Sequence, residues 1–184
     1  MRKNQIKFLS ISLFSLLFLS GCKKDAVEAG DDNELITSVK LNFTTNGTTQ
    51  SFKYSDPDGD GGKAPTVENI SLKANTVYAL TIEILDESKK PVSNITDEIM
   101  KEKDEHLFLY LPTPSTLFTY TYGDKDSRNF NIGLAGNLKT GSMATGKLKF
   151  QLRHQPPING KAVKDGTITP GSDDINIDFN VSIL

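Results

Sequence analysis

Apolar and polar residues alternate along most of the chain after residue 34, which is the pattern of half-buried β-strands. The clearest run is 174–183, where five polar residues alternate with five apolar ones. A period of two excludes an amphipathic helix, whose apolar positions recur every three or four residues. Similar runs predict further strands at 39–44, 52–55, 67–72, 78–84, 107–111, 118–122, 130–134 and 147–152.

One segment departs from this period and predicts a short helix. Ile95, Ile99 and Met100 are apolar at helical spacing, with acidic residues before them and lysines after them, as the helix dipole favours. Ser93 or Asn94 can serve as the N-cap. We expect a helix of about 8 to 11 residues that caps or crosses the sheets.

About nine strands and one helix predict an all-β fold, an antiparallel β-sandwich that is either Ig-like or a flattened barrel. The 184 residues suit one domain of this kind, which we place at 34–184. Asn46-Gly47 is a strong hairpin signal between the first two strands. Segment 22–33 is charged and has no apolar period, so we expect a flexible tether.

The first residues have the features of an export signal. Three basic residues precede an uncharged apolar stretch at 8–19, which is shorter than the roughly 20 residues that span a bilayer. The last residue of this stretch and the three after it, Leu19-Ser20-Gly21-Cys22, resemble the lipobox of bacterial lipoproteins, which signal peptidase II cleaves before the cysteine. The resemblance implies a signal peptide at 1–21 and lipidation of Cys22.

A lipobox implies a membrane anchor. Acyl chains on Cys22 would hold the protein on a lipid bilayer, since each buried CH₂ contributes about 0.8 kcal/mol. Lys23 and Lys24 follow the cysteine, in place of the Asp that retains lipoproteins at the inner membrane. The resemblance therefore implies the outer membrane, with the periplasmic face and the cell surface both open.

Charge and composition exclude several functions. Removing 1–21 takes away three of the 21 basic residues and none of the 23 acidic ones, which leaves a net charge of −5. An acidic chain disfavours nucleic acid as a partner. A single cysteine excludes an internal disulfide framework, and no G-x-S-x-G motif presents a nucleophile, so we expect no enzyme.

An acidic loop is one candidate metal site. Asp56, Asp58 and Asp60 are spaced by two and followed by glycine, as at the start of a calcium loop. The twelfth position is Val67 where an EF-hand has glutamate, so an EF-hand is excluded. A looser calcium site and a solvated turn both remain open.

The two histidines are the other candidate. His106 precedes one predicted strand and His154 follows another, where it shares the parity of the inward residues. If these strands are neighbours, His106 and His154 together with Glu105 or Asp104 could bind zinc or copper. The alternative is two unrelated histidines with structural roles.

Four segments together resemble an uncharacterised family of small all-β envelope lipoproteins: 56–62 (DPDGDGG), 104–110, 152–156 (LRHQP) and 171–181. Members are often labelled "type 1 periplasmic binding fold superfamily". That label denotes two α/β lobes, which a chain with one helix does not fit. The resemblance implies a place beside TonB-dependent outer-membrane receptors.

We therefore expect a lipid-anchored outer-membrane lipoprotein that acts as a non-enzymatic binding or accessory module beside a TonB-dependent receptor. Binding of calcium, or of zinc or copper, at one of the two candidate sites is the leading refinement, and no other cofactor is expected. The alternative is a structural or adhesive cell-surface sandwich without a metal site.

Overall fold

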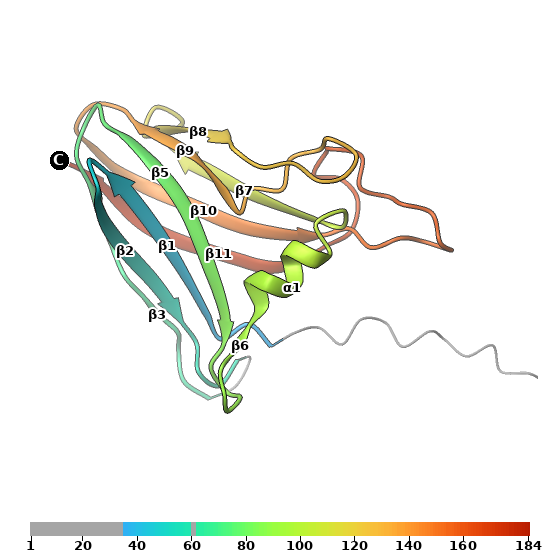
Figure 1. Ribbon diagram of the computed structural model, residues 1–184. Helices are drawn as coiled ribbons and strands as arrows, with labels where there is room; N and C mark the ends of the chain where they lie inside the picture. The colour runs from blue at the N-terminus through green and yellow to red at the C-terminus, as the bar shows by residue number, and fades with distance from the viewer. Residues whose placement is uncertain (1–34, 60–61) are drawn as a thin grey trace, which may run out of the picture. The chain divides into compact units, whose positions relative to one another are not determined.

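The computed structural model describes residues 35–59 and 62–184, which form two facing β-sheets and one short helix (Figure 1). This confirms the predicted all-β sandwich. The larger sheet contains β1 (Ser38–Thr45), β2 (Thr48–Ser55), β3 (Thr66–Val67), β5 (Val77–Asp86), β6 (Ser93–Asn94), β8 (Phe118–Tyr122) and β9 (Ala135–Thr140). The smaller sheet contains β4 (Ile70–Leu72), β7 (His106–Thr113), β10 (Ala144–His154) and β11 (Ser172–Ile183).

Strand order is β3-β2-β1-β5-β9-β8 in the larger sheet, with β6 beside β5, and β4-β11-β10-β7 in the smaller one. Neither sheet closes into a barrel within these described strands. The β11–β4 pair is parallel, whereas the other strand pairs are antiparallel. The prediction of a single strand at 67–72 is wrong. The chain forms two short strands there, β3 in the larger sheet and β4 in the smaller one, and crosses between the sheets from one to the other.

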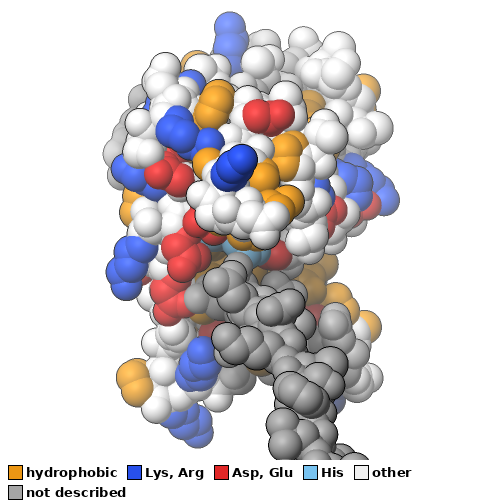
Figure 2. Space-filling view, turned by 90° about the vertical axis from the view of Figure 1, so that its right-hand side faces the viewer, with side chains coloured by type: hydrophobic (Ala, Val, Ile, Leu, Met, Phe, Trp, Pro, Cys, Tyr) orange, Lys and Arg blue, Asp and Glu red, His pale blue; other side chains and the backbone are white. Residues whose placement is uncertain are grey.

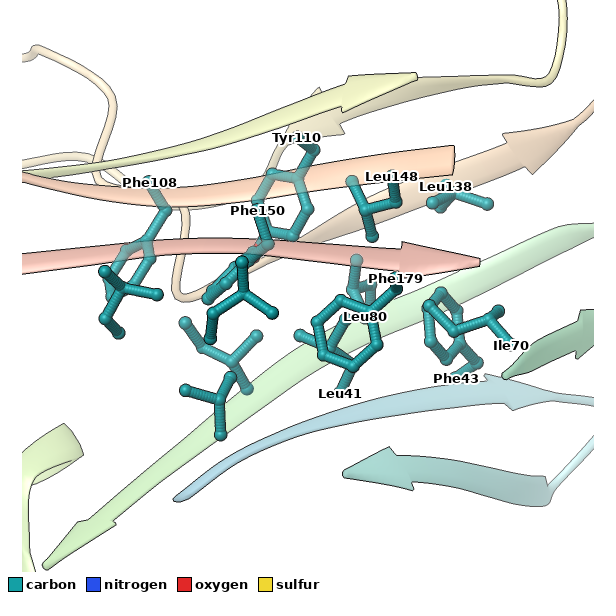
Figure 3. Close-up of a cluster of buried hydrophobic side chains, with 14 of the residues drawn as sticks. Leu41, Phe43, Ile70, Leu80, Phe108, Tyr110, Leu138, Leu148, Phe150 and Phe179 are labelled. Carbon is teal, nitrogen blue, oxygen red and sulfur yellow. The ribbon is translucent and has the colours of Figure 1, made fainter. Parts of the chain in front are cut away.

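Apolar side chains from both sheets fill the space between them (Figure 3). Leu41 and Leu80 come from the larger sheet, Phe150 and Phe179 from the smaller one, and each is at most 1 % exposed. The predicted alternation in β11 holds for its five apolar residues, all of which are buried. Burial of this apolar surface is the main force that holds the two sheets together.

The segment 130–134 differs from its prediction as a strand. Within it, only Asn131 takes part in a bridge, an isolated one with Lys125. The carbonyl of Ile132 accepts a hydrogen bond from β7 and that of Leu134 accepts one from β5, so the segment passes from one sheet to the other. Ile132 and Leu134 are buried at this crossing and Phe130 is half-buried, which explains the alternation without a strand.

The predicted helix is present but shorter, as α1 (Ile95–Lys101), and Asn94 is its N-cap. Ile95 and Ile99 are buried, whereas Met100 is 46 % exposed. The hydroxyl of Thr96 bonds the backbone of β5, which fixes the helix against the larger sheet. The helix lies at the end of the sandwich where β10 ends and β11 begins (Figure 1).

Residues Asn33–Leu184 form one compact unit. The predicted signal peptide at 1–21, Cys22, and the tether at 22–33 lie outside the described residues. Within the described part, the helix is not long or apolar enough to cross a membrane.

Candidate metal centre

The two histidines lie directly opposite each other on neighbouring strands. β7 and β10 pair antiparallel, in a register that sets His106 against His154. The same register pairs Phe108 with Leu152 on the inward face, so both histidines point to the inner side at the end of the strand pair. The rings stack with centroids 4.7 Å apart and planes 5° from parallel. The condition stated for a joint site, that these two strands are neighbours, is therefore met.

His106 is buried, and its tautomer follows from its contact with α1. Its Nδ1 lies 3.0 Å from the carbonyl oxygen of Glu102, the residue that caps the helix. A carbonyl oxygen only accepts hydrogen bonds, so Nδ1 carries the proton. The lone pair of this imidazole is then on Nε2, the nitrogen that can bind a metal.

His154 lies between two carboxylates. Its Nδ1 is 3.7 Å from Oδ2 of Asp174, and its Nε2 is 3.8 Å from Oε2 of Glu105. The His154 side chain is 13 % exposed, so it lies at the rim of the core rather than in solvent. Each of its ring nitrogens thus faces a different acidic side chain.

A β-bulge brings Asp174 to this site. Between β10 and β11, Leu152 pairs with Ile175 and Arg153 pairs with Asp173, which leaves Asp174 as the extra residue. Asp173 remains on the outer face, where its carboxylate lies 2.6 Å from the guanidinium of Arg153. Such bulges redirect a side chain, and here Asp174 turns toward His154. Simple alternation places Asp174 on the outer face, which is why the sequence did not reveal it.

Within the described residues, one group of three metal-ligating side chains comes together: His106, His154 and Asp174, with ligand atoms all within 4.8 Å of one another. Tetrahedral zinc, with bonds of about 2.0–2.1 Å, holds its ligands about 3.3 Å apart. Because each imidazole lone pair lies in the plane of its ring, binding of one ion requires the two stacked rings to turn out of parallel. Two imidazoles and a carboxylate suit zinc or copper(II) better than calcium or magnesium. Figure 2 shows histidine in a hollow of the surface with acidic side chains beside it.

The other predicted ligands lie differently. Glu105 stays next to His154, on the side of the ring away from Asp174. Asp104 accepts a hydrogen bond from the backbone N–H of Ser127 at 2.8 Å. Hydrogen bonds from the side chain and backbone of Ser127 lower the pKa of Asp104 below its ordinary value. Asp104 therefore serves a loop contact instead of the histidine pair.

The acidic loop is described in part, because Asp60 lies outside the described residues. Oδ2 of Asp56 accepts a hydrogen bond from the Tyr54 hydroxyl at 3.2 Å, and Oδ2 of Asp58 accepts one from the backbone N–H of Lys63 at 3.0 Å. Asp56 also lines a cavity of about 180 Å³ together with Asp174. Calcium binding by Asp56, Asp58 and Asp60 stays a prediction.

A buried ion pair supports the chain next to the histidines. Nζ of Lys164 lies 3.0 Å from the Asp126 carboxylate, and neither side chain is exposed. The same amine donates to the carbonyl of Lys103 at 2.9 Å, while Arg128 donates to the carbonyls of Asp104 and Lys164. Burial lowers the pKa of Lys164. These bonds fix the turn that leads to Glu105 and His106. Lysine is so rarely buried that no sequence pattern indicates this ion pair.

Comparison with known proteins yields no relative: no family model, no curated protein and no solved structure matches this chain.

Proposed function

We propose that this chain is an envelope lipoprotein whose β-sandwich binds one divalent transition-metal ion, zinc or copper(II). The ligands are Nε2 of His106, Nδ1 of His154 and the carboxylate of Asp174. The observation that carries the proposal is the convergence of three ligands, two imidazoles and one carboxylate, from three neighbouring strands, one of them bulged, within 4.8 Å. The chain has only two histidines, and both are at this point.

The surroundings of the three side chains favour metal binding over a purely structural contact. Buried Phe108 lies two residues from His106 on the same face of β7, and buried Leu152 lies two residues from His154 on β10. The site therefore has an apolar floor, which strengthens the electrostatic attraction between a metal ion and its ligands. Three protein ligands leave a fourth position for water or another ligand. An ion held in this way can be exchanged, which suits a binding or carrier module and requires no enzymatic step.

The rest of the proposed function rests on the sequence. The lipobox supports acylation of Cys22 and attachment to the outer membrane, and the family resemblance supports a TonB-dependent receptor as partner. The 12 residues of 22–33 can reach at most about 40 Å, which would keep the sandwich near the bilayer. In this arrangement the module would bind metal ions close to a transport receptor.

Isothermal titration of the purified full chain with ZnCl₂ and CuCl₂ tests the metal site. We expect one ion per chain, a higher melting temperature with metal, and reversal of that rise by a chelator. His106→Ala and His154→Ala should each abolish the effect. If neither metal shifts the melting temperature of the unaltered chain, the metal site is rejected and the structural or adhesive alternative stands.

A further inference from the structure

We infer that the turn after α1, residues 102–105, forms the outer shell of this metal centre, and that Glu105 is its positioning residue. In this role Glu105 does not bind the metal. Its carboxylate decides which ring nitrogen His154 presents to the ion. The inference rests on the proposed function, because it concerns the same ion.

The backbone of this turn contacts the His106 ring and the end of the strand that carries His154. The carbonyl of Glu102 accepts from the backbone N–H of Glu105 at 2.9 Å and lies 3.0 Å from Nδ1 of His106. The carbonyl of Glu105 accepts from the backbone N–H of Gln155, next to His154, at 2.6 Å. The start of β7 and the end of β10 are thus hydrogen-bonded to each other where the rings stack. Because the backbone of Glu105 is held by these bonds, its side chain is positioned beside His154.

The charge of Glu105 favours one tautomer of His154. Each ionised carboxylate only accepts hydrogen bonds, so Glu105, 3.8 Å from Nε2, favours a proton on Nε2, whereas Asp174, 3.7 Å from Nδ1, favours one on Nδ1. An ion bound beside Asp174 takes the place of a proton on Nδ1, so the metal-bound ring keeps its proton on Nε2, toward Glu105. Histidines that bind metals commonly donate their other N–H to a carboxylate or a backbone carbonyl. Here His154 would use Glu105 and His106 would use the Glu102 carbonyl.

The same geometry argues against Glu105 as a direct ligand. The two nitrogens of one imidazole point away from each other, so a single ion beside Nδ1 of His154 is out of reach of a carboxylate beside Nε2. The charges also balance in this arrangement. A divalent ion, one carboxylate ligand and one outer carboxylate sum to zero, which lowers the cost of holding the ion in a partly buried site.

Zinc titration of the full chain and of two variants tests this role. Glu105→Gln removes the charge beside His154. Glu102→Gln removes the same charge from an exposed side chain of the same turn, whose contact with His106 is made by its backbone. We expect Glu105→Gln to weaken zinc affinity about 10- to 100-fold and Glu102→Gln to leave it unchanged. The melting temperatures of the two variants without metal should agree, which excludes misfolding as the cause.

The tautomer of His154 is a second measurement. It would not change in Glu105→Gln if Glu105 had only a structural role. Long-range ¹H–¹⁵N spectra of the metal-free chain should show a larger share of the His154 proton on Nδ1 in Glu105→Gln than in the unaltered protein, because the charge of Asp174 is then no longer opposed by that of Glu105. The same tautomer mixture in both proteins would overturn the positioning role.

The outcomes of the titration separate the two proposals. An unaltered chain that binds no zinc overturns the proposed function and this inference with it. Binding that is equal in the unaltered chain and both variants overturns the inference alone. Binding that Glu105→Gln abolishes as completely as His154→Ala would make Glu105 a direct ligand and would likewise overturn its positioning role.

Discussion

Asp174 and His154 meet on the inner side of the smaller sheet, with Oδ2 of the aspartate 3.7 Å from Nδ1 of the histidine. The meeting depends on one extra residue in β11, which turns Asp174 away from the face that strict alternation assigns to it. Asp173, its neighbour, stays outside and pairs with Arg153. Two adjacent aspartates therefore have different environments, which makes them a matched pair for experiment.

Asp174→Asn should lower zinc affinity at least about 100-fold, because an amide replaces the one carboxylate among the three proposed ligands. Asp173→Asn is the control. It removes a partly exposed ion pair worth about 0–1 kcal/mol and should leave zinc affinity unchanged. Competition with a zinc-chelating dye measures both. Equal losses in the two variants would mean that overall charge, and not the bulge, attracts the metal.

The sequence indicated a joint site for the two histidines on the condition that their strands are neighbours, and it indicated only part of the surroundings. The parity of His106 and His154 follows from the apolar residues in their own strands, so a local pattern was enough. The contribution of Asp174 depends on a register shift between two strands, and no local pattern encodes it. Residues 130–134 show the same limit of local patterns. Apolar and polar residues alternate there as in a strand, although the segment crosses between the two sheets without forming one.

Lys164→Met should destabilise the fold by about 3–5 kcal/mol, because it leaves the buried carboxylate of Asp126 without its cation. Two backbone N–H groups donate to the other oxygen of Asp126, and asparagine can still accept from them. The double variant Lys164→Met/Asp126→Asn should therefore recover part of the loss. Urea unfolding of the three proteins measures it. A single variant as stable as the unaltered chain would show that the ion pair adds nothing.

Stability should fall in acid. Hydrogen bonds from Ser127 lower the pKa of Asp104, and those from Arg153 lower the pKa of Asp173, in both cases from an ordinary value of 3.8. Near that pH the unfolded chain binds more protons than the folded one, so this contribution to stability is present above pH 4 and disappears as the pH falls through the lowered values. Melting curves from pH 7 to pH 2 should show it. Asp104→Asn should flatten part of the decline, and an unchanged curve would contradict the assignment.

Cys22→Ala should prevent lipidation and leave the leader on the chain. Intact-mass spectrometry should then find residues 1–21 retained and no acyl mass, and detergent-phase partitioning should drop. Ser20→Ala, which keeps a small residue before the cysteine, should leave processing intact. Partitioning and mass that do not respond to Cys22→Ala would contradict the lipobox.

The proposed outer-membrane location can be tested separately. Lys23→Asp places aspartate directly after the cysteine that we propose to be acylated, and it should move the chain to the inner membrane. Membrane fractionation on a sucrose gradient measures the change, with Lys23→Arg as the control that keeps the basic residue. A chain that fractionates identically in both variants would show that residue 23 does not direct sorting.

The most direct measurement is anomalous diffraction at the zinc edge from crystals of the zinc-loaded protein. We predict one main peak, at about 2.0–2.2 Å from Nε2 of His106, Nδ1 of His154 and a carboxylate oxygen of Asp174. A protein that takes up zinc elsewhere, or shows no peak between the two imidazoles, would contradict the metal centre.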